Sequence, residues 1–372
     1  MSRLVDEFLE LVQIDSETKH EEVIAPILKD KLEQLGFSVI EDDSASKTGH
    51  GAGNLIATLK GAHANVDPIY FTVHMDTVVP GKGIRPVIKE DGYIYSDGTT
   101  ILGADDKAGI AALFEAIRRL KEQSIEHGDI QIVITAGEES GLVGAKELDS
   151  SLLTAKYGYA IDSDGTVGGI VTAAPFQSKL WTTITGKTAH AGVAPEKGIS
   201  AITLAAKAIS AMKLGRLDAE TTANIGRFEG GQATNIVCDV VHILSEARSI
   251  DQDKLDAQVA HMVTTFAETA EKFGGKAVTE TQLMYPGFRF EEEHHVVQVA
   301  KRAVERIGRT AEIKTSGGGS DANVIAGFGI PTVILSVGYE EIHTTNERMP
   351  IEELEKLADL IVEIVLVASE IK

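Results

Sequence analysis

Histidine and acidic side chains occur at five separate points of the chain, each beside an expected strand or helix end. These points are His74-Met75-Asp76, Asp105-Asp106-Lys107, Glu138-Glu139, Asp162 and His343. Two histidines with several carboxylates form a hard nitrogen and oxygen donor set, which suits zinc, manganese or cobalt. The single cysteine, Cys238, excludes a multi-thiolate zinc site. The chemistry that this set favours is hydrolysis assisted by bound metal.

Hydrolysis by a metal pair needs further groups with defined roles. Two metals a few ångströms apart share a bridging carboxylate and activate a water molecule. A carboxylate that does not bind metal must take the proton of that water and pass it to the leaving amine. The adjacent Glu138 and Glu139 can divide these roles, one as base and one as ligand. Asp76, two residues after His74, can orient the histidine ring.

Each of the five points also has an ordinary structural interpretation. A histidine after a strand is commonly a hydrogen-bonded loop residue, and Asp-Asp before a helix is commonly an N-cap. A pair of glutamates after a strand is commonly a solvated turn. What indicates function is their expected convergence, because ligands of open α/β sheets lie beyond the carboxyl ends of the strands.

The segments that must position these side chains alternate between helix and strand. We expect helices over residues 1–13, 21–35 (closed by Gly36) and 106–121. We expect strands over residues 37–41, 54–60, 69–74, 129–136 and 157–161. After Pro286 the same pattern returns, with helices over 294–307 and 351–369 and strands over 312–315 and 332–337. This alternation predicts an α/β fold with a mixed, mostly parallel sheet flanked by helices.

The block between these two parts has a different character. Its expected strands are 179–185, 222–228, 237–246 and 278–284, and its expected helices are 199–212 and 255–273. Two helices on an antiparallel sheet form an α+β unit. The sequence therefore predicts a metal-binding catalytic domain of residues 1–177 and 287–372, interrupted by an inserted domain of residues 178–286.

Composition limits the partners and the location. The 372 residues carry a formal net charge of −21, which disfavours a nucleic-acid partner. No uninterrupted apolar run is long enough to predict a membrane span, and the N-terminal segment is too acidic for a signal peptide. One cysteine excludes an internal disulfide and fits a reducing cytoplasm, which is the location we expect.

Eight motifs follow one another in a fixed order along nearly the whole chain. They are Thr72-Val73-His74-Met75-Asp76-Thr77-Val78, Leu102-Gly103-Ala104-Asp105-Asp106-Lys107-Ala108-Gly109, Thr135-Ala136-Gly137-Glu138-Glu139-Ser140-Gly141, Asp162, Gly186-Lys187-Thr188-Ala189-His190-Ala191-Gly192, Gly230-Gly231-Gln232-Ala233-Thr234-Asn235, Gly319-Ser320-Asp321 and His343. With them the sequence resembles the co-catalytic dinuclear zinc exopeptidase family that contains peptidase T, carboxypeptidase G and aminoacylase. The second motif is most similar to peptidase T-like proteins.

The resemblance implies two divalent metal ions per subunit, zinc first, with manganese or cobalt as alternatives. The implied ligands of one metal are His74, Asp105 and Asp162, and those of the other are Asp105, Glu139 and His343. Asp106 is the rival for the bridging position, but Asp105 takes the family's place two residues before Lys107. The family also implies a cis peptide bond between Asp105 and Asp106. Glu138 would be the general base, and Asp76 would orient His74.

The inserted domain would then be the family's lid and dimerisation domain, and the protein a homodimer. His190 would reach into the partner's site and stabilise the oxyanion. Asn235 and Arg248 would contact the substrate, a short peptide. In the turn before an expected helix, the N–H groups of Gly318, Gly319 and Ser320 would hold a substrate carboxylate.

One departure from the family pattern affects the expected substrate. Tripeptidases usually have arginine where this chain has Gly317, so the residue that would pair with a substrate carboxylate is absent. The predicted activity is an exopeptidase of the tripeptidase or aminopeptidase kind. An N-acyl amino acid amidohydrolase or a carboxypeptidase of the same family is the alternative.

Two other classes of protein are alternatives, a phosphatase and a non-catalytic binding protein. Asp162-Ser163-Asp164-Gly165-Thr166 resembles the nucleophile motif of haloacid-dehalogenase-type phosphatases, but that class places the motif early in the chain and its acidic pair downstream. Here the motif is central and Asp105-Asp106 lies upstream. The other interpretation is a non-catalytic, peptide-binding relative. Loss of ligands would indicate that role, whereas all five predicted ligands and the base are present.

Overall fold

The structure is a computed structural model that describes residues 2–370, and the chain folds into two compact units. The first unit comprises the chain up to Ala173, Phe290–Ser316, and the chain from Ser320 onward. The second unit comprises Ala174–Arg289 and Gly317–Gly319. The sequence-based boundaries are 178 and 286, and the pattern gave no sign that the short segment 317–319 packs with the second unit.

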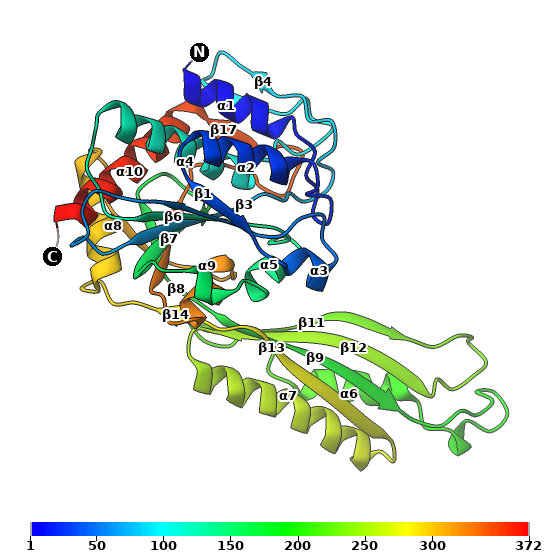
Figure 1. Ribbon diagram of the computed structural model, residues 1–372. Helices are drawn as coiled ribbons and strands as arrows, with labels where there is room; N and C mark the ends of the chain where they lie inside the picture. Colours follow the sequence, from blue (N-terminus) through cyan, green and yellow to red (C-terminus); the bar gives the residue numbers. More distant parts are fainter. Residues whose placement is uncertain (1, 371–372) are drawn as a thin grey trace. The chain divides into compact units, whose positions relative to one another are not determined.

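A mixed sheet forms the centre of the first unit (Figure 1). In spatial order its strands are β1 (Ser38–Glu41), β2 (Leu55–Leu59), β6 (Ile130–Thr135), β3 (Ile69–His74), β7 (Tyr157–Ser163), β16 (Thr332–Ser336) and β8 (Gly169–Ala174), with β15 (Glu312–Thr315) also paired to β8. The pairs β6/β3, β3/β7, β7/β16 and β8/β15 are parallel. The pairs β1/β2, β2/β6 and β16/β8 are antiparallel. The predicted mixed, mostly parallel sheet is confirmed.

Both faces of this sheet are covered by helices, which explains why the central strands β3, β6 and β16 are buried along their whole length. One face packs against α1 (Arg3–Val12), α2 (Ile24–Gln34), α4 (Ala104–Glu122), α8 (His295–Arg306) and α10 (Ile351–Glu370). The other face carries α5 (Val143–Lys146), the 3-10 turn Ser150–Leu152 and α9 (Asp321–Gly327), with α3 (Ser44–Thr48) beside α5. In β3, Phe71 and Val73 face the first layer and Tyr70 faces the second, as the period of two requires.

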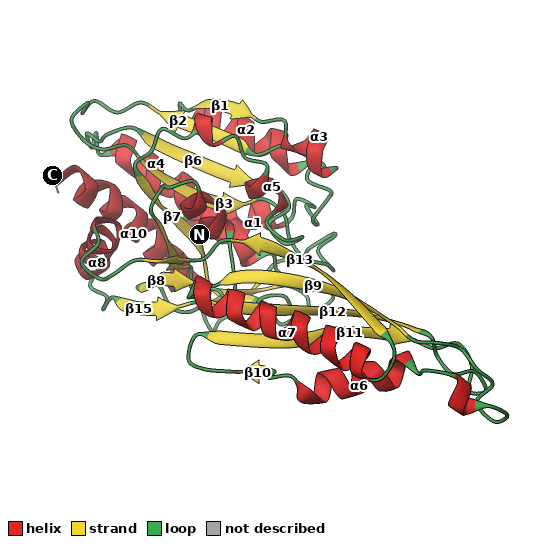
Figure 2. Cartoon of the chain, turned by 90° about the horizontal axis from the view of Figure 1, so that it is seen from below, coloured by secondary structure: helices red, strands yellow, loops and turns green. Residues whose placement is uncertain are grey.

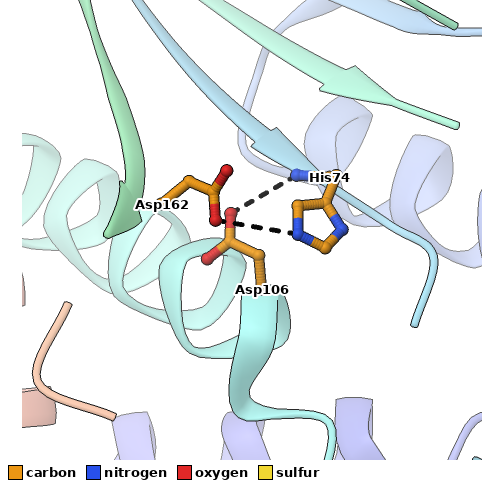
Figure 3. A group of neighbouring side chains, drawn as sticks. All are labelled: His74, Asp106 and Asp162. Carbon is orange, nitrogen blue, oxygen red and sulfur yellow. Dashed lines mark hydrogen bonds and ion pairs between the residues drawn. The ribbon is translucent and has the colours of Figure 1, made fainter. Parts of the chain in front are cut away.

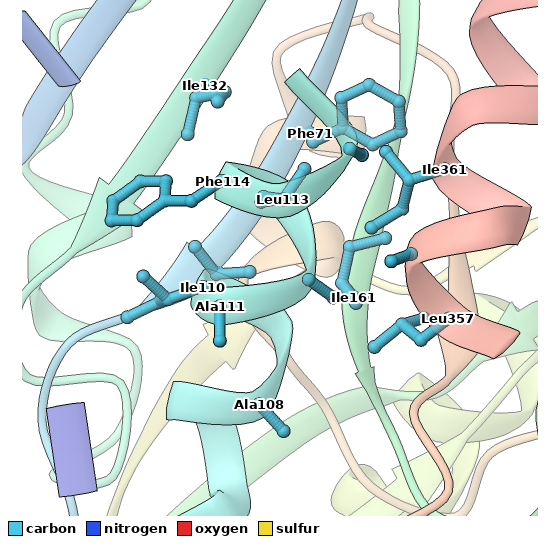
Figure 4. Close-up of a cluster of buried hydrophobic side chains, with 14 of the residues drawn as sticks. Phe71, Ala108, Ile110, Ala111, Leu113, Phe114, Ile132, Ile161, Leu357 and Ile361 are labelled. Atoms are coloured by element: carbon cyan, nitrogen blue, oxygen red, sulfur yellow. The ribbon is translucent and has the colours of Figure 1, made fainter. Parts of the chain in front are cut away.

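Helix α4 is the buried centre of the first unit, and its amino end carries two of the residues singled out above. In Figure 4, Leu357 and Ile361 of α10 point toward Leu113 of α4 and Ile161 of β7. Leu113 and Phe114 are fully buried, and side chains of this size each contribute roughly 1.5–3 kcal/mol on burial. The helix is therefore a rigid support for the residues at its start.

A small antiparallel sheet lies beside this core. It consists of β4 (Val87–Ile88), β5 (Tyr93–Tyr95) and β17 (Arg348–Pro350). These three strands are not predicted from the sequence, because two or three residues are too few to establish an alternating pattern. Their function is to anchor the chain on either side of the candidate site, as described below.

The second unit is a five-stranded antiparallel sheet with two helices on one face (Figure 2). In spatial order the strands are β10 (Gly215–Arg216), β11 (Thr221–Gly230), β12 (Val240–Ser249), β9 (Phe176–Thr185) and β13 (Lys276–Tyr285), and the helices are α6 (Ala201–Ala211) and α7 (Gln252–Lys272). The 3-10 turn Pro195–Lys197 precedes α6, and the short strand β14 (Phe288–Arg289) ends the unit. Leu180 and Ile184 of β9 are buried, whereas Trp181 between them is 40% exposed.

Two element boundaries differ from the expected ones in ways that matter for the site. The helix expected from residue 106 begins at Ala104, but Asp105 and Asp106 have non-helical backbone angles, so the chain kinks there. The strand expected over 157–161 continues to Ser163, which places Asp162 inside β7 and not in a turn after it. Among residues 2–370, no helix combines the length and apolarity needed to cross a bilayer.

Candidate active site

Parallel strands bring several of the singled-out residues to one edge of the sheet. His74, the last residue of β3, lies beside Thr135, the last residue of β6, in the strand register. Asp162 lies near the end of β7, whose Ser163 pairs with Ser336 at the end of β16. The chain segments that follow these four strands therefore open at the same carboxyl edge, where ligands of such sheets bind.

The first predicted ligand set, His74, Asp105 and Asp162, is brought together. His74 Nε2 lies 3.0 Å from Asp105 Oδ1 and 3.8 Å from Asp162 Oδ1. The histidine is fully buried and the two carboxylates nearly so. Figure 3 shows His74 at the end of β3 with Asp162 of β7 on one side.

The second predicted set, Asp105, Glu139 and His343, is also brought together. His343 Nε2 lies 3.2 Å from Asp105 Oδ2 and 3.0 Å from Glu139 Oε1. One oxygen of Asp105 therefore faces His74 and the other faces His343, which is the arrangement that a bridging carboxylate requires. His343 has a φ of 61°, an unusual backbone conformation for this residue type, and its side chain is half exposed.

Asp106, the rival bridging residue, lies deeper. Its Oδ2 accepts a hydrogen bond from the backbone N–H of His74 at 3.3 Å, as Figure 3 shows. Its Oδ1 has no hydrogen-bond partner among the described residues. Asp106 can join His74 and Asp162 around one cation, whereas the group that contains Glu139 among the described residues includes Asp105 instead. The peptide bond between Asp105 and Asp106 is cis, as expected.

Asp76 holds both the first histidine and the turn with the two glutamates. Its carboxylate accepts hydrogen bonds from the backbone N–H groups of Glu138 and Glu139, at 3.0 and 3.2 Å. His74 Nδ1 lies 2.9 Å from the backbone oxygen of Asp76 and 3.5 Å from its Oδ1. A hydrogen on Nδ1 satisfies these acceptors, which fixes the ring so that Nε2 faces Asp105.

The carboxylates around the two histidines favour the charged form of each imidazole. Burial alone would lower the pKa of His74, but its contacts with Asp105 and Asp76 raise that pKa well above the ordinary value. Hydrogen bonds to Asp105 and Glu139 raise the pKa of His343 to about 10. Burial would raise the pKa of Asp105, but the hydrogen bonds from His343 and His74 lower it.

The remaining carboxyl groups of the cluster repel one another. Loss of hydration, and then the charge of Asp162, raises the pKa of Glu138 well above its ordinary value. Burial and the charge of Asp105 do the same for Asp162. The adjacent Lys107 offers little compensation, since burial lowers its pKa to about 7. The cluster thus gathers more acidic than basic side chains.

This donor set fits divalent metal ions. Ligand atoms of His74, Asp105 and Glu139 lie within 4.8 Å of one another, and so do those of His74, Asp106 and Asp162. Metal binding displaces protons from histidine and carboxyl ligands. Bound cations would therefore supply the positive charge that balances these carboxylates. Imidazole nitrogens and carboxylate oxygens without thiolates are the donors preferred by zinc and manganese.

In the second unit, His190 and Asn235 lie together. His190 forms a bridge with Ile236, and the backbone oxygen of Asn235 accepts from Ala191 at 2.9 Å. Both side chains are exposed. His190 Nδ1 accepts from the backbone N–H of Gly192 at 3.2 Å, so the ring hydrogen is on Nε2 and points away from the turn.

Arg248 lies at the opposite end of the same sheet. It pairs with Gln177 of β9, whereas Thr185, at the other end of β9, pairs with Val240 near the His190 turn. Eight residues of strand separate these points, a distance of about 26 Å. Arg248 donates to the backbone oxygen of Gly317 at 3.1 Å and is 3.5 Å from the hydroxyl of Tyr285. Within this unit the structure therefore does not bring Arg248 close to His190.

The Gly317–Ser320 turn is packed more tightly than the sequence indicates. A Cβ atom at Gly319 would lie 2.4 Å from the ring of Tyr285, so only glycine fits there. The backbone N–H of Ser320 donates to Asn323 Oδ1, and its hydroxyl accepts from the N–H of Ala322. Both groups of Ser320 are thus engaged in capping α9, as in an ordinary capping box.

Three residues near the cluster have no role in the sequence-based assignment. Tyr339 donates to Asp162 Oδ1 at 3.2 Å, and Thr135 donates to Asp321 Oδ2. Glu347 accepts from the backbone N–H groups of Leu102, Gly103 and Asp105. Tyr339 and Glu347 each stand four residues from His343, but nothing in a loop sequence tells which neighbours face inward.

Comparison with known proteins assigns this arrangement to a family. The model of peptidase family M20/M25/M40 matches residues 70–367, which include every residue of the cluster. The chain belongs to peptidase family M20/M25/M40. Membership excludes the phosphatase interpretation of Asp162-Ser163-Asp164, and it confirms the resemblance drawn from the eight motifs.

Three members of the M20 family illustrate the relationship. Aminopeptidase PepT from Bacillus cereus is 66% identical, with 98% of each chain covered and a TM-score of 0.95. A tripeptidase from Staphylococcus aureus is 54% identical over 99% of this chain and 98% of its own, with a TM-score of 0.97. Peptidase T from Fusobacterium nucleatum is 31% identical over 93% of this chain and 90% of its own.

Proposed function

We propose that this M20 protein is a metal-dependent aminopeptidase that removes the amino-terminal residue of tripeptides and other short peptides. The observation that carries the proposal is the position of Asp105, whose two oxygens face His74 and His343. Support for the substrate class comes from the Bacillus cereus aminopeptidase and the Staphylococcus aureus tripeptidase, which are similar along nearly their whole length.

The proposed cofactor is a pair of divalent metal ions, zinc first, with manganese and cobalt as alternatives. His74, Asp105 and Asp162 would hold one ion, and Asp105, Glu139 and His343 the other. When bound, such a pair lowers the pKa of a water molecule and polarises the carbonyl of the scissile bond. The absence of thiolate ligands favours zinc or manganese over softer metals.

The residues of the chain supply the proton transfer. Glu138 lies beside the cluster without contacting His74 or His343, and its raised pKa suits a carboxyl group that must carry a proton. We assign it the role of general base, which takes a proton from water and delivers it to the leaving amine. Asp76 fixes the backbone of Glu138 and the ring of His74, so it orients the base and a ligand together.

The second unit is proposed to be a lid through which two copies form a homodimer. The chain enters and leaves this unit at the Arg248 end of the sheet, about 26 Å along β9 from the His190 turn. We therefore assign His190 to the partner's site, where its Nε2–H would stabilise the oxyanion. Asn235, Arg248, Gly318 and Gly319 are the proposed substrate contacts. Ser320 was expected to join them, but its N–H donates to Asn323 Oδ1 and its hydroxyl caps α9. A cytoplasmic location agrees with the single cysteine.

The test is a substrate screen with the purified full-length protein. Dipeptides, tripeptides and N-acyl amino acids are incubated with zinc, manganese or cobalt, and the released residue is identified by mass spectrometry. Release of the amino-terminal residue from tripeptides is expected. Release of the carboxyl-terminal residue, or cleavage of N-acyl amino acids alone, would reject the aminopeptidase assignment in favour of the family alternatives. Peptide binding without turnover would favour the non-catalytic interpretation.

A further inference from the structure

Glu347 is a buried carboxylate that holds the turn in front of Asp105. Its side chain is almost inaccessible, with 1% of the residue exposed. Glu347 Oε2 accepts hydrogen bonds from the backbone N–H groups of Leu102 and Gly103, both at 2.8 Å. Its Oε1 accepts from the backbone N–H of Asp105 itself at 3.1 Å. Three of the four N–H groups from 102 to 105 thus end on one carboxylate.

The turn that Glu347 holds cannot be fixed by helix geometry. Gly103 has a left-handed φ of 72°, and the backbone at Asp105 is extended, so α4 provides no regular hydrogen-bond partners for these N–H groups. A carboxylate that accepts several N–H groups makes strong, charge-assisted hydrogen bonds. The direction in which the Asp105 side chain points is therefore set largely by Glu347.

Glu347 is itself held from two sides. The next residue, Arg348, begins β17 and pairs with Tyr95 of the small sheet. On the other side, the N–H of Glu347 donates to the backbone oxygen of Thr344 at 3.2 Å, which closes the turn that begins at His343. One short segment therefore carries His343 at one end and the group that holds the turn of Asp105 at the other.

The same device occurs on the other side of the cluster, where the Asp76 carboxylate accepts the N–H groups of Glu138 and Glu139. We propose that Glu347 is a positioning residue of the metal centre, which couples the placement of Asp105 to that of His343. This inference rests on the proposed function, since it takes both residues as ligands of the metal pair. The hydrogen bonds of the Glu347 carboxylate all go to backbone N–H groups, so it would act on the ligands through the backbone.

The decisive variant is Glu347→Gln, which keeps the size of the side chain. An amide has one acceptor oxygen, so in either orientation at least one of the three N–H groups loses its partner and faces the NH₂ group. The matched control is Glu353→Gln. Glu353 is also buried and also accepts a backbone N–H, that of Val167 at 2.7 Å, and its carboxylate pairs with Arg309 and not with the turn of Asp105.

Cobalt binding to the metal-free protein, followed by visible absorption, is the primary measurement, because it needs no substrate. Residues that orient ligands typically contribute 10–100-fold to metal affinity, so Glu347→Gln is expected to weaken cobalt binding by about that factor and to alter the absorption spectrum. Glu353→Gln is expected to remain within about twofold of the wild type. At saturating metal, the kcat for a tripeptide should fall in Glu347→Gln with little change in KM.

Glu347→Asp serves as the conservative variant. It retains both acceptor oxygens and should recover part of the affinity, and its circular dichroism and cobalt titration replace those of Glu347→Gln if the latter does not fold. Unchanged cobalt affinity and kcat in a folded Glu347→Gln would overturn the inference, as would an equal loss in Glu353→Gln. If the wild type cleaves no peptide while cobalt binding weakens only at position 347, the proposed function fails and the inference stands.

Discussion

At the scale of single residues, Glu138 is the side chain on which turnover should depend most directly. Glu138→Gln keeps the size and removes the base, so kcat should fall by about 10²–10⁴-fold, the usual contribution of general acid-base catalysis. Metal content should stay at the wild-type value, since the assigned ligands are untouched. The checks are tripeptide turnover and elemental analysis of the same sample. Full activity in the variant would remove Glu138 from the proton-transfer role.

The residues of the cluster differ in how far a sequence reveals them. His74, Asp105, Glu139 and His343 were identified because their side chains belong to a recognisable donor set. The structure places each of them within hydrogen-bond distance of at least one other. Glu347 was not identified, because its side chain accepts hydrogen bonds from backbone N–H groups. Such a contact leaves no pattern in the sequence and depends on a turn that only tertiary structure defines.

At the scale of elements, three helices of the first unit are joined through Glu115 of α4. Its carboxylate binds Arg3 of α1 and Arg119 of α4, both at 2.8 Å, and Arg119 also reaches Glu355 and Asp359 of α10. The side chain of Glu115 is 6% exposed. Burial would raise the pKa of Glu115, but the hydrogen bonds from Arg3 and Arg119 outweigh burial and lower it.

The sign of the resulting pH dependence follows from this lowered pKa. A carboxyl group with a lower pKa in the folded state stabilises the fold above its unfolded pKa, and that contribution is lost as the pH falls through the folded pKa. Glu115→Gln should therefore lower the free energy of unfolding by about 1–2 kcal/mol near neutral pH. Below about pH 4, the free energies of unfolding of Glu115→Gln and the wild type should become more similar.

Urea unfolding at several pH values measures this difference. Glu122→Gln is the control, since Glu122 also binds Arg3 but is 58% exposed, and exposed pairs contribute little. If Glu115→Gln lowers the free energy of unfolding by the same amount in acid as at neutral pH, packing and not the ion pairs links the three helices.

Long, regular elements were well predicted, and short or irregular ones were not. The expected strand 69–74 coincides with β3, because a buried strand has a clear apolar limit. The helix was expected from residue 106, but α4 begins at Ala104 and has non-helical backbone angles at Asp105 and Asp106, which propensity does not predict. At this position the needs of the site override the local preference of the chain.

At the scale of the whole molecule, metal binding should stabilise the first unit and not the second. All the assigned ligands lie in the first unit, where the carboxyl groups repel one another without a cation. Metal at about 100 times its Kd adds about 2.7 kcal/mol, which for a domain of this size is roughly 5–10 °C in Tm. Calorimetry of chelator-treated and zinc-loaded protein should show this shift, and His343→Ala should reduce it. Equal Tm shifts in the wild type and in His343→Ala would show that the stabilising ions bind elsewhere.

The proposed sharing of His190 between subunits predicts that two inactive variants can restore activity in a mixed dimer. Glu138→Gln and His190→Ala should each be nearly inactive alone. In a mixed dimer, one site would combine the intact Glu138 of one subunit with the intact His190 of the other, and the second site would lack both. After random exchange, half of the dimers are mixed and each has one working site of two, so about one quarter of wild-type activity should return.

A double variant provides the control for this mixing experiment. His190→Ala mixed with Glu138→Gln/His190→Ala contains no intact His190, so no site can recover. If His190 instead serves the site of its own subunit, the two single variants will not complement each other either, although subunit exchange can be verified independently by mass spectrometry. The separation of about 26 Å between the His190 turn and the Arg248 end of its own sheet is the reason to expect complementation.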